Sequence, residues 1–220
     1  MPDWVEPVAR YILEVGLRNT LKLAAIALVG STLIGITLGT LLTIRFLPTR
    51  ALIRAYIEVW RGLPILVTIF LVFFALPAMS QTLRFDPITA GAIALILWGS
   101  AQVAETTRGA VQSIPREQHE AASALGFGWV GRHAFVIMPQ ALRRLLPPLV
   151  GLLVNIIQNT TIVQVIGAPE ILETAERQVE RLTYEGDIHA IEIYGAVMVM
   201  FFVISFPLTR LAAYLERRLA

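Results

Sequence analysis

The sequence contains no cysteine and only one lysine, Lys22. Without cysteine the chain can form no disulfide, no thiolate nucleophile and no cysteine-ligated metal site. Lys22 does not follow a glycine-rich loop, so the P-loop that cradles nucleotide phosphates is also absent. The chain therefore cannot hydrolyse ATP by that route, and if it belongs to a pump, another subunit binds the ATP.

Histidine and aspartate are scarce, and their positions are His119, His133, His189, Asp3, Asp86 and Asp187. The sequence after His119 and Glu120 continues as Ala-Ala-Ser, so the HExxH pair of zinc ligands does not form. The aspartates all fall outside the long apolar windows, which leaves no intramembrane aspartate dyad. We therefore expect no catalytic residue, no metal site and no cofactor in this chain, and an intramembrane hydrolase is disfavoured.

Charge is sparse and gathered in blocks. Charged residues make up 15% of the chain and hydrophobic residues 56%, and the mean hydropathy is +0.68. This composition does not suit a soluble domain and indicates a polytopic membrane protein. The net charge of +2 gives no reason to expect a nucleic-acid partner. The first ten residues are acidic and lack a basic segment before an apolar core, so we expect no cleaved signal peptide.

Five windows without Asp, Glu, Lys or Arg are long enough, or nearly so, to cross a bilayer, which needs about 20 residues. With flanking residues they predict membrane spans over roughly residues 16–44, 55–79, 87–113, 140–166 and 190–214. The first window carries Ser31, Gly35 and Gly39 at intervals of four, a small-residue stripe that allows helix backbones to approach closely. We predict an all-α fold, a membrane bundle of five transmembrane helices forming a single domain over residues 1–220.

The arginines predict the orientation in the membrane. With five spans, one side of the membrane collects twelve of the 18 Lys and Arg residues and the other side collects six. Because cytoplasmic loops carry the Lys/Arg excess, the N-terminus is expected outside and the C-terminus in the cytoplasm. The acidic segment 170–187 then lies outside, either as a solvated face or as a landing surface for a periplasmic partner.

Polar residues crowd the fourth predicted span, at Asn155, Gln158, Asn159, Thr160 and Thr161. Residues three and four apart share a helix face, so the three amides lie together. They either bond to neighbouring helices, or they line a hydrated path that a polar solute follows. So many polar groups within ten residues favours the path.

Two glutamates lie near arginines at the inner ends of the second and third predicted spans. Glu58 has Arg54 and Arg61 at helical spacing, and Glu105 has Arg108. Charges within a membrane need a partner or a cavity. Ion pairing is the simpler interpretation, while a role in gating or substrate contact keeps Glu58 and Glu105 among the candidate path residues.

The stretch from Glu120 to Pro139 is the longest break between apolar runs on the arginine-rich side. Residues 120–125 predict a short helix, and Gly126 can adopt the positive φ that often follows a helix end. Between Glu120 and Leu125 the helix carries only Ala and Ser, so another protein could approach it closely. A surface turn would explain the same composition.

This stretch resembles the cytoplasmic loop of permease subunits of ATP-binding-cassette importers. The matching residues are Glu120, Ala121, Ala122, Gly126 and Pro139, with Val136 and Met138 in place of the usual Ile and Leu. Further segments, such as Arg61-Gly62-Leu63-Pro64 and Asn159-Thr160-Thr161, are similar to the branch that imports polar amino acids. The resemblance implies a loop helix that couples to a cytoplasmic ATPase, an external solute-binding protein, a second permease subunit, and an amino acid substrate.

The alternative from a different class is a stand-alone secondary transporter or channel for small polar solutes. Such transporters are commonly built from inverted repeats. The five windows show no inverted repeat and no buried proton relay, which favours the importer subunit.

Overall fold

The computed structural model describes residues 3–44 and 46–219, and every regular element in that part of the chain is a helix. The elements in chain order are α1 (Val5–Tyr11), the π-helical η1 (Ile12–Leu17), α2 (Arg18–Leu41), α3 (Leu47–Gly62), α4 (Ile65–Phe70), the π-helical η2 (Leu71–Ala75), α5 (Leu76–Met79), the 3₁₀ turn η3 (Gln81–Leu83), α6 (Pro87–Gln112), α7 (Arg116–Ala124), α8 (Trp129–Arg132), the π-helical η4 (His133–Ile137), α9 (Met138–Asn159), the 3₁₀-helical η5 (Thr160–Ile166), α10 (Ile171–Glu185) and α11 (Ala190–Leu219).

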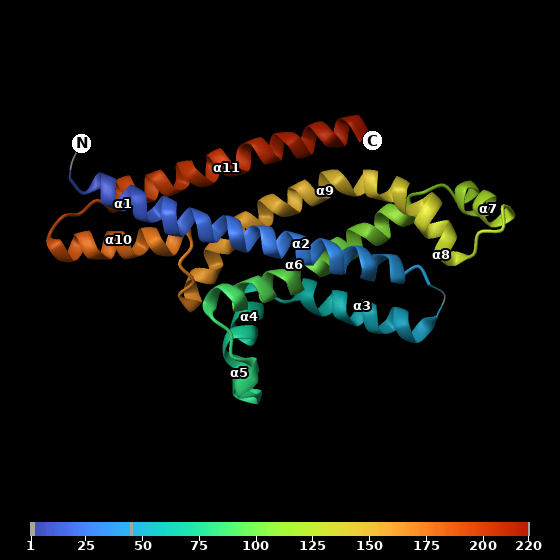
Figure 1. Cartoon of the computed structure of the whole chain (residues 1–220), viewed down its shortest axis with the longest axis horizontal. Helices are drawn as coiled ribbons and strands as arrows, with labels where there is room; N and C mark the ends of the chain where they lie inside the picture. Colours follow the sequence, from blue (N-terminus) through green and yellow to red (C-terminus); the bar gives the residue numbers. More distant parts are fainter. Residues whose placement is uncertain (1–2, 45, 220) are drawn as a thin grey trace.

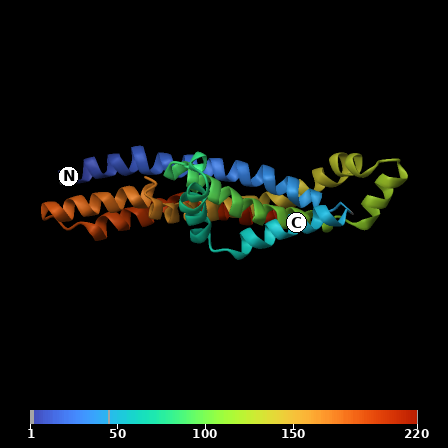
Figure 2. The ribbon, with the colours of Figure 1, turned by 90° about the horizontal axis from the view of Figure 1, so that it is seen from below.

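Four continuous helices are long and apolar enough to cross a membrane: Val5–Leu41, Pro87–Gln112, Trp129–Ile166 and Ala190–Leu219. They run along the long axis of the molecule (Figure 1), which confirms the predicted membrane helical bundle. Figures 1 and 2 both show α1, α10 and the first turns of α11 at one end, and α7 and α8 at the other. We refer to these as the α10 end and the α7 end.

The second predicted span is not one straight helix. Helix α3 and the helix Ile65–Met79 meet at an angle of 108°, and α4 and α5 project sideways from the bundle (Figure 1). Pro64 explains the break, since its ring removes an N–H and disfavours helical geometry at the preceding residue. Leu63 is extended, with φ −83° and ψ 137°. The pair counts as a fifth crossing only if both arms are taken as one span.

The most extensive packing between two helices of the bundle joins α2 to α6, and it runs through small residues. A Cβ added at Gly35 would lie 2.4 Å from the Cβ of Val103 and 2.8 Å from the carbonyl oxygen of Ser100. A Cβ at Gly39 would lie 2.4 Å from the carbonyl oxygen of Ala104. The stripe predicted from the sequence is therefore confirmed as the surface on which the two helices meet.

The α10 end is held together by polar contacts to the first long helix. The side-chain amide of Asn19 donates to the carbonyl oxygen of Pro169 at 2.9 Å, and the backbone N–H of Ile171 donates to the Thr20 hydroxyl at 3.1 Å. Trp4 stacks on His189 with 4.2 Å between ring centroids. These contacts fix the start of α10 and the residue before α11 against the N-terminal part of the chain.

Glu170 caps α10 from a fully buried position. Its carboxylate accepts from the backbone N–H groups of Leu172 at 3.0 Å and Glu173 at 2.8 Å. Burial raises the pKa of Glu170 to about 7, although these two hydrogen bonds oppose the rise. A titrating carboxyl group thus lies inside the packed α10 end.

Two of the π-helical segments precede a proline within a continuous helix. Pro77 follows η2, and Pro139 follows η4. A proline ring clashes with the carbonyl four residues earlier, and the wider π turn relieves that clash. The helix from Trp129 therefore runs through Pro139 without a break.

Candidate functional site

The stretch that carries the loop signature folds as a helix and a tight turn. Helix α7 begins four residues before Glu120, at Arg116, and ends at Ala124. Gly126 has a φ of +85°, and the N–H groups of Gly126 and Phe127 donate to the carbonyl oxygens of Ser123 at 3.0 Å and Ala122 at 3.1 Å. The predicted role of Gly126 in ending the helix is confirmed, because such a φ disfavours residues other than glycine.

The two alanines of the signature differ in burial. Ala122 is buried, whereas Ala121 and Glu120 are exposed, and Glu120 accepts from Arg116 at 2.8 Å. The Glu120 carboxylate is accordingly available on the surface, with only an exposed ion pair that contributes little to stability. Pro139 is exposed on the helix that leaves the loop.

Large apolar side chains are exposed around the end of α7. Leu125 is 78% exposed, Val130 71% and Phe135 73%. These three side chains belong to no motif, and their only signal in the sequence is that they are apolar residues outside the predicted spans. Leu125 lies in the turn after α7, and Val130 and Phe135 lie in the first turns of the helix Trp129–Ile166. Exposed apolar side chains gathered beside a turn are typical of a protein contact surface.

Side-chain contacts hold the loop on the bundle. The Arg132 guanidinium donates to the Ser123 hydroxyl at 2.9 Å, and Arg144 donates to the carbonyl oxygen and hydroxyl of Ser113 at 2.7 and 2.6 Å. Burial lowers the pKa of His119, and the nearby Arg132 lowers it further. The loop is thus an ordered surface and not a loose connection.

The amides of the fourth span lie on the outside of this single chain. Asn155 and Gln158 are exposed and Asn159 is half-buried. None of the three side-chain amides makes a hydrogen bond within the described part of the chain. Their neighbour Ile156 is buried beside Gly99, close to the middle of α6, which puts Asn155 at about the same depth.

The two threonines behave differently from the amides. Thr160 is fully buried, and its hydroxyl donates to the carbonyl oxygen of Ile157 at 2.7 Å. The hydroxyl of Thr161 donates to the carbonyl oxygen of Gln158 at 2.7 Å. Both hydroxyl protons are therefore committed to the backbone where α9 passes into η5, and the hydroxyl oxygens retain only their acceptor capacity.

Glu105 and Glu58 also differ. Glu105 is half-buried, and its carboxylate accepts from the Arg108 guanidinium at 3.1 and 3.2 Å, so that predicted pair is present. Glu58 is exposed and makes no ion pair among the described residues. The Arg61 guanidinium instead donates across to Gln102 of α6 at 3.2 Å. The expected pairing of Glu58 is therefore not found, because α3 directs Arg61 toward α6.

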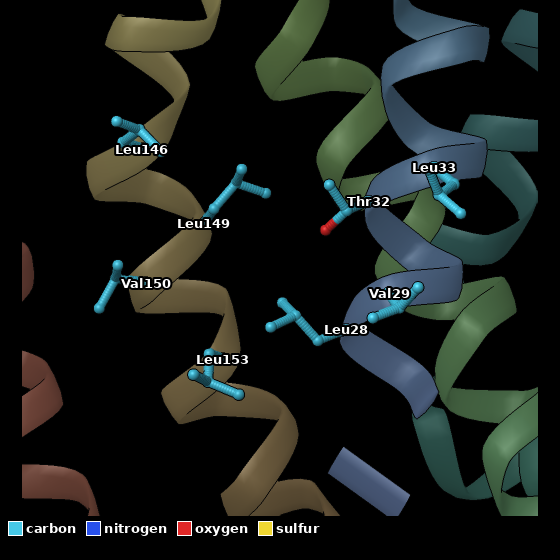
Figure 3. A pocket seen from close by; sticks show the side chains of 8 residues that line it. All are labelled: Leu28, Val29, Thr32, Leu33, Leu146, Leu149, Val150 and Leu153. Atoms are coloured by element: carbon cyan, nitrogen blue, oxygen red, sulfur yellow. The ribbon is translucent and has the colours of Figure 1, made fainter. Parts of the chain in front are cut away.

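A pocket of about 370 Å³ opens between α2 and α9, and Figure 3 shows side chains of both helices around it. Its lining residues are Leu28, Val29, Thr32, Leu33, Leu146, Leu149, Val150 and Leu153. None of the predicted path residues belongs to this lining. Since a polar solute needs hydrogen-bonding partners, this apolar pocket is unsuited to an amino acid.

Comparison with known proteins decides between the remaining classes. Residues 31–220 match the family described as "Binding-protein-dependent transport system inner membrane component". The chain belongs to this family. It is a membrane-spanning permease subunit, which rejects the hypotheses of a stand-alone transporter, a channel or a hydrolase.

Relatives and solved structures extend the match over nearly the whole permease. The glutamine transport system permease protein GlnP of Escherichia coli (strain K12) is 35% identical over 99% of this chain and 97% of its own length. The probable glutamine ABC transporter permease protein GlnM of Bacillus subtilis (strain 168) is 32% identical over 93% of this chain and 91% of its own. A crystal structure of an amino acid ABC transporter with histidines superposes with a TM-score of 0.83, at 30% identity and 99% coverage of both chains. The MetNI methionine transporter, at 16% identity, shares the fold with a TM-score of 0.78 over 98% of this chain and 99% of its own.

Proposed function

We propose that this permease forms part of the transport path of an ATP-driven importer in the inner membrane, with its N-terminus outside and its C-terminus in the cytoplasm. The twelve-to-six division of Lys and Arg residues supports this orientation. The α7 end then faces the cytoplasm and the α10 end faces outward. A reporter fused after Gly128 is expected to report the cytoplasm, and export of that reporter would contradict the orientation.

The α7 loop is the proposed docking surface for a separate ATPase subunit, which binds and hydrolyses the ATP. The segment Glu120–Gly126 contributes an exposed carboxylate and an exposed alanine face. The exposed Leu125, Val130 and Phe135 add an apolar surface for a groove on the partner. Movement of the ATPase would pass through this loop into the helix that contains Pro139.

The α10 end is the proposed landing surface for a periplasmic or extracellular solute-binding protein. Tyr184, Ile188 and Ile191 are exposed there beside the acidic residues of α10. Aromatic residues such as Tyr are enriched at protein interfaces, which carry a polar rim. A second permease subunit, identical or homologous, completes the path across the membrane.

The substrate is proposed to be a polar amino acid, with glutamine as the first candidate because the relatives at 35% and 32% identity are named as glutamine permeases. One observation carries the proposed path: Asn155 and Gln158 are exposed within a membrane span and lack partners in the described chain. An amide without a hydrogen-bond partner in hydrocarbon costs on the order of several kcal/mol, so these side chains must face water, substrate or a second subunit. A zwitterion needs both donors and acceptors, and amides provide both.

The path is tested by glutamine uptake into vesicles that contain the assembled importer and its binding protein. Asn155→Leu and Gln158→Leu are expected to reduce uptake while leaving assembly and basal ATP hydrolysis near normal. Met198→Leu, an apolar change at an exposed site on α11, is the matched control. Normal uptake by both leucine variants would contradict the path. If the leucine variants fail to assemble, but transport normally once a second packing change restores assembly, the amides only join helices.

A further inference from the structure

His133 is a buried polar side chain in an otherwise largely exposed loop, with only 5% of its surface accessible. Its Nδ1 lies 2.8 Å from the carbonyl oxygen of Trp129. A carbonyl can only accept, so Nδ1 carries the proton. In the neutral ring Nε2 is then an acceptor, and it lies 3.0 Å from the hydroxyl of Thr43. This contact joins the start of η4 to the residues just after α2, 90 positions earlier in the chain.

A second contact lies one turn away from the first. The Thr40 hydroxyl is 3.5 Å from the sulfur of Met138. Thr43 lies in the turn that follows α2, where its backbone N–H donates to the carbonyl oxygen of Thr40 at 3.0 Å, so the two threonines lie close together at the end of the helix. His133 and Met138 are five residues apart, and a π turn brings residues i and i+5 onto one face. The wide turn of η4 therefore matches both contacts to the end of the first helix.

The Thr43 hydroxyl keeps a hydrogen-bond partner when its contact with His133 breaks. The Thr43 hydroxyl lies 2.7 Å from the carbonyl oxygen of Thr40 as well as 3.0 Å from His133 Nε2. It has one proton and two acceptors within reach, so it can turn to its own helix whenever His133 moves away. A contact with such an alternative is suited to repeated opening and closing, because neither state carries the penalty of an orphaned donor.

We infer that Thr43 and His133 form a releasable joint that ties the position of the α7 loop to the first long helix. The inference rests on the proposed function, in which the loop moves with the ATPase. Closure of the joint holds the loop and α2 in the arrangement described here. Its opening lets the loop shift relative to α2, so His133 is a positioning residue that contacts neither substrate nor nucleotide.

The test measures ATP hydrolysis by the assembled importer in vesicles, with and without substrate-loaded binding protein. Thr43→Val keeps the shape of the side chain and removes the hydroxyl. The ratio of stimulated to unstimulated hydrolysis is expected to fall by at most about 12-fold, the value for loss of one whole hydrogen bond, because the alternative bond to Thr40 offsets part of the loss. Thr43→Ser keeps the hydroxyl and is expected to retain the ratio.

Two further variants separate the joint from general damage. Thr37→Val removes a hydroxyl that donates to Leu33 within the same helix at 2.8 Å, and it is expected to leave the ratio unchanged. Thr43→Val, His133→Leu and the double variant are compared. The double variant is expected to lower the ratio no further than the more damaging single variant, because each substitution removes the same contact. A normal ratio in Thr43→Val, or effects that multiply in the double variant, would overturn the joint.

A measurement on the permease alone keeps the two proposals distinguishable. Since the chain has no cysteine, Leu33→Cys and Leu125→Cys place two spin labels at exposed positions on the first helix and on the loop. Thr43→Val is expected to broaden the distribution of distances between the labels, and an unchanged distribution would contradict the joint. If the unaltered importer shows no stimulated hydrolysis, the proposed function fails, while the label distances still decide the joint.

Discussion

Gly35→Ala tests whether α2 and α6 are packed at the limit that their backbones allow. The added methyl carbon would lie 2.4 Å from the Cβ of Val103 and 2.8 Å from a backbone oxygen. Neither atom can move by a rotamer change, so the helices must separate. Overpacking of this kind costs about 1–3 kcal/mol. Alanine also removes the helix penalty of glycine, a gain of about 0.5–1 kcal/mol that partly offsets the clash.

Gly151→Ala isolates that gain, because Gly151 lies within α9 and a Cβ there would meet no atom of the described chain within 4 Å apart from its chain neighbours and the backbone of its own helix turn. The difference between the two variants therefore measures the clash alone. At about 3 °C per kcal/mol for a chain of this length, Gly35→Ala should unfold about 3–9 °C below Gly151→Ala. The assay is thermal unfolding of the detergent-solubilised permease. Equal midpoints for the two variants would refute the argument that the small-residue stripe sets the distance between the helices.

Two more predictions concern the two ends of the molecule. Because burial raises the pKa of Glu170 from 4.5 to about 7, the folded state holds this proton more tightly than the unfolded state. The resulting stability is fully present below about pH 4.5 and is lost as pH rises through 7, a change of about 3 kcal/mol. Glu170→Gln keeps a neutral cap at every pH. The stability of the α10 end, measured by amide hydrogen exchange at pH 5 and pH 8, should therefore vary less with pH in this variant than in the wild type. An equal pH dependence in both proteins would contradict this prediction. At the other end, Gly126→Val forces a β-branched residue to a φ of +85°, so the variant should insert normally in the membrane but retain less ATPase in co-purification, and full retention would count against the loop as the docking surface.

Composition and local pattern predict the parts of this fold that depend on neighbouring residues in the sequence. The long apolar windows predict the membrane bundle, and the spacing of Ser31, Gly35 and Gly39 predicts where α2 meets α6. Gly126 marks the end of α7 because the requirement for positive φ is local. Each of these signals lies within a few residues of the feature it specifies.

The features that the sequence does not reveal depend on direction or on distant partners. Hydropathy windows count residues and carry no angle, so the presence of Pro64 could not indicate a bend of 108°. The contact between Thr43 and His133 joins positions 90 residues apart, and neither residue belongs to a recognisable motif. The exposure of Leu125 and Phe135 could not be predicted for a related reason. An apolar residue reads the same in the sequence whether its side chain is buried or exposed.

The break between α3 and α4 has a consequence for the membrane itself. Among residues 3–44 and 46–219, no side chain caps the end of α3 or the start of α4. Helix geometry leaves the carbonyl oxygens of Arg61 and Gly62 and the N–H of Leu66 without helical partners. Arg61 contacts Gln102, so the break lies beside a helix that is long and apolar enough to cross the membrane. These backbone groups therefore need water or a second permease subunit as a partner, because hydrocarbon offers no hydrogen bond. Lipid alone cannot surround this chain at the break.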